Sequence, residues 1–107
     1  MSEHHDRHGY AEAVLALYRT ASGTTGRTSF RDRRLAEGWF DRGVPLTTVK
    51  MALVLAERRR QRSLTTPRLR PIRSLHYFVP IIAELLAAPP PPGYLAYLAG
   101  SPEPGPP

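Results

Sequence analysis

The chain of 107 residues contains no cysteine. Disulfide bonds and cysteine-ligated metals are therefore excluded, and any core must be held together by packing and hydrogen bonds. Small secreted domains usually depend on disulfides, so their absence favours a reducing compartment, and we expect a cytoplasmic protein. The polar start at Met1–Asp6 lacks the apolar stretch of a secretory signal.

Long hydrophobic runs are also missing. The longest, Val79–Ala88, spans ten residues and includes Pro80 and Glu84, whereas a membrane-spanning helix needs about 20 apolar residues. We therefore expect no contact with a membrane. No segment alternates polar and apolar residues between turn dipeptides, so no strand is expected either.

Apolar residues instead recur at helical spacing in four segments. These run from about Gly9 to Ala21, from Ser29 to Gly43, from Thr47 to Arg62 and from Ser74 to Ala87. We expect an all-α fold, a small orthogonal bundle of four helices over residues 9–88. Residues 1–8 should be disordered, and 89–107 should form a Pro-rich, partly disordered tail with room for a short helix. The predicted core contains Val14, Leu17, Leu35, Trp39, Val49, Leu53, Phe78, Ile82 and Leu85.

Several helix ends can be predicted from short-range chemistry. Ser29 followed by Asp32 predicts a side-chain cap for the second helix, and Gly43 predicts its end. Thr47 is the expected cap of the third helix, which would pair Leu46 with Met51 as a hydrophobic staple. Ser74 is expected to cap the fourth helix. There Pro80 should introduce a kink or delay the start, because proline lacks a backbone N–H.

Acidic residues are scarce in the second half of the chain. Residues 58–107 carry seven arginines, all between Arg58 and Arg73, with no acid among them, and the chain has a net charge of +6. An arginine-rich composition explains why there is only one lysine, but not this clustering. Guanidinium groups can each donate two hydrogen bonds to a phosphate, so the cluster predicts salt-dependent nucleic-acid binding. The predicted phosphate contacts are Arg58, Arg59, Arg60, Arg62, Arg68, Arg70 and Arg73, and Tyr77 is a candidate for base stacking although its spacing also suits the core.

Two other interpretations of the cluster stay open. It could be a solvated loop, or it could dock on an acidic partner protein in a larger assembly. In that adaptor interpretation the tail would take part in docking, through Pro89–Pro92 and the apolar residues Tyr94, Leu95, Tyr97 and Leu98.

Catalysis has little support in the sequence. A general acid–base pair needs two groups within reach of each other, and the carboxylates are scattered among arginines. We expect neither an enzyme nor a cofactor. His4, His5 and His8 have metal-ligand chemistry, but they lie at a chain end without evident supporting residues, so we expect only adventitious metal binding and no metal site.

The order of motifs resembles a known family. Asp32–Leu35, Trp39–Leu53 and Ile72–Tyr77, with Ile81 and Leu85, resemble the helical C-terminal domain of DnaD-type primosome proteins and related phage and plasmid replication proteins. Tyr77, Ile81 and Leu85 match its Tyr-x-x-x-Ile-x-x-x-Trp pattern, with leucine in place of tryptophan. The resemblance covers roughly half of the chain and lacks the family's winged-helix domain. It implies non-specific DNA binding in replication or mobile-element maintenance, and contact with a helicase or an initiator.

Overall fold

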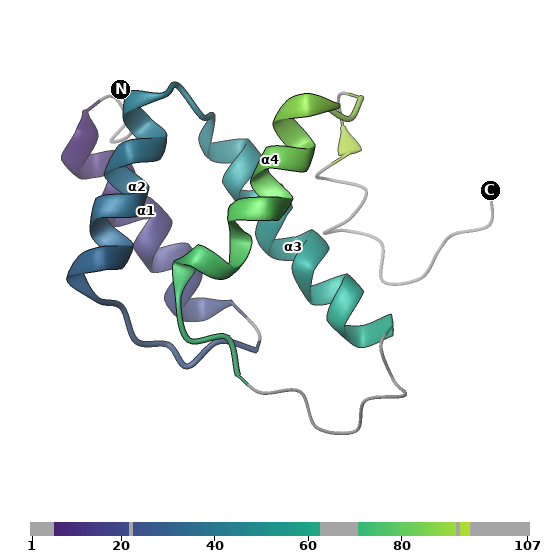
Figure 1. Cartoon of the computed structure of the whole chain (residues 1–107), viewed down its shortest axis with the longest axis horizontal. Helices are drawn as coiled ribbons and strands as arrows, with labels where there is room; N and C mark the ends of the chain where they lie inside the picture. Colours follow the sequence, from purple (N-terminus) through teal and green to yellow (C-terminus); the bar gives the residue numbers. More distant parts are fainter. Residues whose placement is uncertain (1–5, 22, 63–70, 92, 95–107) are drawn as a thin grey trace.

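The computed structural model describes residues 6–21, 23–62, 71–91 and 93–94. The described residues form four α-helices and one 3₁₀-helix and contain no strand (Figure 1). The prediction of an all-α bundle of four helices is confirmed. α1 lies along α2, and α3 crosses behind α4 and packs on it (Figure 1). The elements are α1 (Arg7–Thr20), α2 (Phe30–Asp41), α3 (Leu46–Arg62), η1 (Leu75–Phe78) and α4 (Val79–Ala87).

The core lies where the four helices meet. Seven of the nine predicted core residues are buried, while Leu17 and Leu35 are partly buried at its edge. Leu17 is displaced from the centre because its neighbours Leu15 and Tyr18 take the inward positions of α1. The largest fully buried side chain is Trp39.

The ends of α2 follow the short-range prediction. Ser29 Oγ accepts a hydrogen bond from the Asp32 amide at 3.2 Å, and the Asp32 carboxylate accepts one from the Ser29 amide at 2.9 Å. This reciprocal pair is a capping box. The helix ends before Gly43, whose φ of +77° places it in the left-handed region.

The starts of α1 and α3 differ from expectation. α1 begins at Arg7, two residues early, because the Asp6 carboxylate caps it by accepting from the Gly9 amide. The predicted Thr47 cap of α3 is wrong. The Pro45 carbonyl already accepts hydrogen bonds from the amides of Thr48 and Val49, so Thr47 lies inside the helix and the predicted staple loses its basis.

Proline delays the last helix, as expected. Ser74 caps η1 by accepting from the His76 amide at 3.1 Å. The chain changes from 3₁₀ to α geometry at Val79, which places Pro80 in the first turn of α4, where its missing N–H leaves no hydrogen bond unmade.

Two loops meet at one end of the bundle through Ile72. Its amide donates to the Gly23 carbonyl at 2.7 Å, and its carbonyl accepts from the Thr25 amide at 2.9 Å and from the Tyr18 hydroxyl at 3.0 Å. The loop between α1 and α2 is thereby held against the segment that precedes η1. We call this end of the molecule the loop edge, formed by residues 23–27 and 71–73.

Candidate nucleic-acid interface

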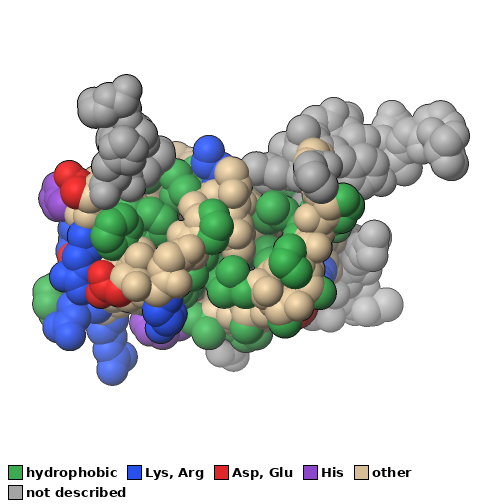
Figure 2. Space-filling model, turned by 90° about the horizontal axis from the view of Figure 1, so that it is seen from above, with side chains coloured by type: hydrophobic (Ala, Val, Ile, Leu, Met, Phe, Trp, Pro, Cys, Tyr) green, Lys and Arg blue, Asp and Glu red, His purple; other side chains and the backbone are tan. Residues whose placement is uncertain are grey.

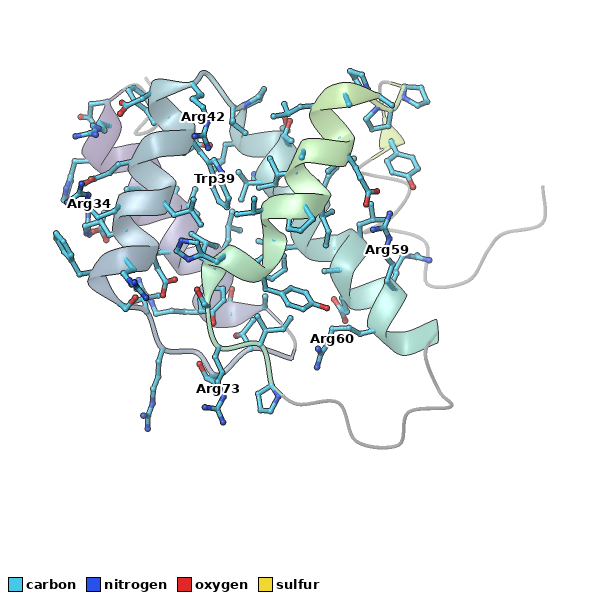
Figure 3. The ribbon with its side chains drawn as sticks, in the orientation of Figure 1. Arg34, Trp39, Arg42, Arg59, Arg60 and Arg73 are labelled. Atoms are coloured by element: carbon cyan, nitrogen blue, oxygen red, sulfur yellow. The ribbon has the colours of Figure 1, made fainter. Side chains whose placement is uncertain are left out.

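The predicted arginines differ in their exposure and in their contacts. Arg68, Arg70 and the side chain of Arg62 lie outside the described residues. Arg58 is partly buried on α3. In Figure 3, Arg59 and Arg60 diverge from α3, and Arg73 lies at the lower end of the molecule with Arg60.

Arg59 is engaged by an acid from another helix. Its Nη1 and Nη2 atoms donate to the two carboxylate oxygens of Glu84 on α4, at 3.1 and 2.8 Å. These hydrogen bonds lower the pKa of Glu84 and raise that of Arg59. The second half of the chain therefore carries a counter-charge that linear spacing could not reveal, since the partners are 25 residues apart.

Arg60 and Tyr77 come together, although they belong to α3 and η1. The Arg60 guanidinium lies 6.0 Å from the centre of the Tyr77 ring, at the limit of a cation–π contact. Gly23 gives it space, because a Cβ at that position would lie 3.3 Å from Arg60 Nε. Tyr77 is 44% exposed and its ring meets Phe78 edge-on. The predicted stacking residue is thus partly covered by Arg60 and Phe78.

The loop edge brings Arg27, which was not among the predicted phosphate contacts, near the predicted contact Arg73. Arg27 and Arg73 are both exposed and line one hollow of about 610 Å³ with Thr24, Thr25 and Pro71. Among the residues that the structure describes, no carboxylate lines this hollow. In the sequence, only its charge pointed to Arg27, because its place in the same hollow as Arg73 depends on hydrogen bonds between two loops that are distant in the sequence.

Two acids of α2, Glu37 and Asp41, pair with Arg7 of α1 rather than with the arginines of their own helix. Asp41 accepts two hydrogen bonds from Arg7 of α1, at 2.9 and 3.1 Å. Arg33 pairs with Glu12 of α1, which lowers the pKa of Glu12. In the part of the chain that the structure describes, Arg31 and Arg34 have no acidic partner.

Those two arginines border a second hollow. It is lined by Phe30, Arg31, Arg34, Leu35 and His76, and we call it the Phe30 hollow. The Arg34 guanidinium lies 5.6 Å from the centre of the Phe30 ring. In the sequence, Phe30 is an aromatic residue that directly follows a predicted helix cap and precedes several arginines. That pattern is equally typical of a residue buried in the core.

Figure 2 shows the molecule from above, at the end that lies opposite the loop edge. Hydrophobic side chains cover much of its middle, and basic side chains gather over α1 and α2 with acidic ones among them. Arg42 lies at this end, away from Arg60 and Arg73 (Figure 3). Acidic side chains therefore accompany the basic ones at this end, whereas the described residues that line the loop-edge hollow include none.

Two other predicted features can be placed in part. His8 is exposed on α1, and His4 and His5 lie outside the described residues, among which no group of acidic, histidine or cysteine side chains could hold a metal. Leu95, Tyr97 and Leu98 of the tail also lie outside. None of the helices, over their described residues, has the length and apolar character needed to cross a bilayer.

Comparison with known proteins adds no relative. No family model, no curated protein and no solved structure matches the chain.

Proposed function

We propose that this protein is a non-enzymatic nucleic-acid-binding accessory protein that contacts phosphates through its loop edge. The observation that carries the proposal is that Arg27 and Arg73, from two separate loops, line one hollow together with Thr24 and Thr25. Both guanidinium groups are exposed and can donate, and the described residues of the lining include no carboxylate to compete for them. The Thr24 hydroxyl already donates to the Tyr18 and Ala21 carbonyls. The two guanidinium groups suit a phosphate of a nucleic-acid backbone.

Arg60 and Tyr77 extend the proposed contact beyond the hollow. Arg60 lies at the same end of the molecule as Arg73 (Figure 3). A phosphate that binds Arg59 must compete with Glu84 for its guanidinium. The resemblance to DnaD-type proteins supports DNA as the ligand, a role in replication or mobile-element maintenance, and a helicase or initiator as partner. The absence of cysteine supports a cytoplasmic location.

A salt titration of two matched variants tests the proposal. We would measure the affinity for a fluorescent DNA oligonucleotide from 20 to 300 mM salt, by anisotropy. Replacing Arg27 and Arg73 by alanine should lower the affinity and flatten the slope of log K against log salt by about 1 to 2, since each lost phosphate contact removes close to one counterion. Arg42→Ala is the control, because it removes the same kind of charge from the opposite end and should change the slope little.

The outcomes separate the proposal from its rivals. If the wild-type protein does not bind DNA or RNA at low salt, the proposal is wrong and docking on an acidic protein becomes the better interpretation. If Arg42→Ala weakens binding as much as each loop-edge substitution does, the protein attracts DNA through its net charge alone and the loop edge is not the interface.

A further inference from the structure

An exposed aromatic ring lies beside the proposed interface. Phe30 is the first residue of α2, directly after the capping residue Ser29, and 70% of its surface is exposed. The buried residues of the same helix, Ala36 and Trp39, face the core. Phe30 therefore contributes little to the hydrophobic core, although full burial of its ring would be worth roughly 2 kcal/mol.

Two arginines and a histidine lie near this ring. Arg34 lies over it, and Arg31 and His76 line the same hollow. The imidazole of His76 is positioned by Ser74, whose Oγ lies 3.0 Å from Nδ1. Because Asp41, Glu37 and Glu12 engage Arg7 and Arg33, no acid among the described residues neutralises Arg31 or Arg34. The patch combines one π face with uncompensated positive charge.

The Phe30 hollow is close to the loop edge along both segments that form it. Arg27 and Phe30 are three residues apart, and so are Arg73 and His76. Three residues span at most about 11 Å. A single extended ligand can therefore contact both hollows at once.

We propose that Phe30 is a stacking platform for an unpaired base, and that the protein prefers single-stranded nucleic acid. The inference rests on the proposed function and names its ligand more narrowly. Every base offers a π face to an exposed aromatic ring, whereas in a duplex both faces are already stacked on neighbouring pairs. Phenylalanine has no hydrogen-bonding group, so the site does not select among the bases. Arg31 and Arg34 bind the phosphates on either side of the stacked base.

The test compares an unpaired ligand with a paired one. Affinity for an oligothymidylate, which cannot pair with itself, is measured beside affinity for a duplex of equal length. Phe30→Ala should weaken binding of the single strand by about 5- to 150-fold, the usual range for one lost stacking contact, and change duplex binding less than about 2-fold. Phe30→Leu keeps an apolar side chain without a π face and should behave like Phe30→Ala. Leu86→Ala removes another exposed apolar side chain, on α4, and should leave both affinities unchanged.

Phe30→Trp provides a direct signal. It should retain single-strand affinity, and its fluorescence should be quenched when oligothymidylate binds, while Trp39, only 1% exposed, supplies a constant background. Circular dichroism confirms that each variant keeps its helical content. The proposal is overturned if Phe30→Ala leaves single-strand affinity unchanged or weakens both ligands equally, or if the tryptophan emission does not respond. Should the wild-type protein bind neither ligand, the proposed function falls too, whereas binding that depends on Arg27 and Arg73 but not on Phe30 removes only the stacking site.

Discussion

The carboxylate of Asp32 on α2 accepts a hydrogen bond from the backbone amide of Leu75, 43 residues later in the chain, at 3.0 Å. The same carboxylate accepts from the Ser74 hydroxyl at 3.1 Å and from the Ser29 amide at 2.9 Å. Asp32 is 1% exposed, so these donors replace the water that a buried charge would otherwise need. One side chain thus caps α2 and holds the start of η1.

Asp32→Ala should lower the free energy of unfolding by about 2 to 4 kcal/mol. The substitution removes a helix cap and leaves the amides of Ser29 and Leu75 without an acceptor. Urea denaturation followed by circular dichroism measures the loss. Ser29→Ala, which removes only the local half of the capping box, should cost about 1 kcal/mol. Equal losses in the two variants would mean that the link to η1 contributes nothing.

Two glycines of the α2 region should respond to alanine with opposite signs. Gly43 has a φ of +77° and open space where a Cβ would lie, so Gly43→Ala should cost about 1 kcal/mol through backbone strain alone. Gly38 lies inside the helix, also with open space, so Gly38→Ala should stabilise by about 0.5 to 1 kcal/mol. Thermal unfolding of both variants checks the signs, and a loss of stability in Gly38→Ala would contradict the assigned helix.

Alkaline pH should destabilise the fold through Tyr10. Burial raises its pKa to about 12, above the ordinary value near 10. The folded state therefore holds the phenolic proton more tightly than the unfolded state does. Stability is full below pH 10 and falls as the pH rises toward 12, by up to about 3 kcal/mol. Burial raises the pKa of Tyr18 too, which adds to the fall in the same direction.

Tyr10→Phe isolates this effect. At pH 8 the variant should lose about 1 kcal/mol, because the Tyr10 hydroxyl donates to the Val44 carbonyl at 2.8 Å. Between pH 10 and 11.5 its stability should fall less steeply than that of the wild type. Urea denaturation across this range gives both slopes, and parallel slopes would show that Tyr10 is not the group responsible.

Much of the fold could be predicted from neighbouring residues. The Ser29–Asp32 cap, the stop at Gly43 and the delay at Pro80 each depend on residues within one turn of one another, and all three are confirmed. The Thr47 cap failed because a backbone carbonyl, that of Pro45, supplied the acceptor instead. The link between Asp32 and Leu75 could not be predicted, since it depends on how α2 packs against η1.

In the candidate site, too, features set by neighbouring residues could be predicted, and features set by packing could not. The arginine cluster near the end of α3 could be read from charge alone. The ion pair of Arg59 with Glu84 and the hollow shared by Arg27 and Arg73 arise only when separate elements pack together. The exposure of Phe30 could not be predicted, because sequence patterns do not distinguish an exposed aromatic residue at a helix start from a core residue.

The hydroxyl of Tyr18 should control the order of the loop edge. It donates to the Ile72 carbonyl, which also accepts from the Thr25 amide. Tyr18→Phe should cost about 1 kcal/mol of global stability and, in addition, raise hydrogen exchange at the Thr25 and Ile72 amides above the increase elsewhere in the core. Tyr10→Phe is the matched control, because it removes a similar hydrogen bond remote from this loop and should raise exchange without that local excess. If both variants change the two amides equally, Ile72 is held by packing alone, and Arg73 owes its position to the apolar contacts of its neighbour rather than to Tyr18.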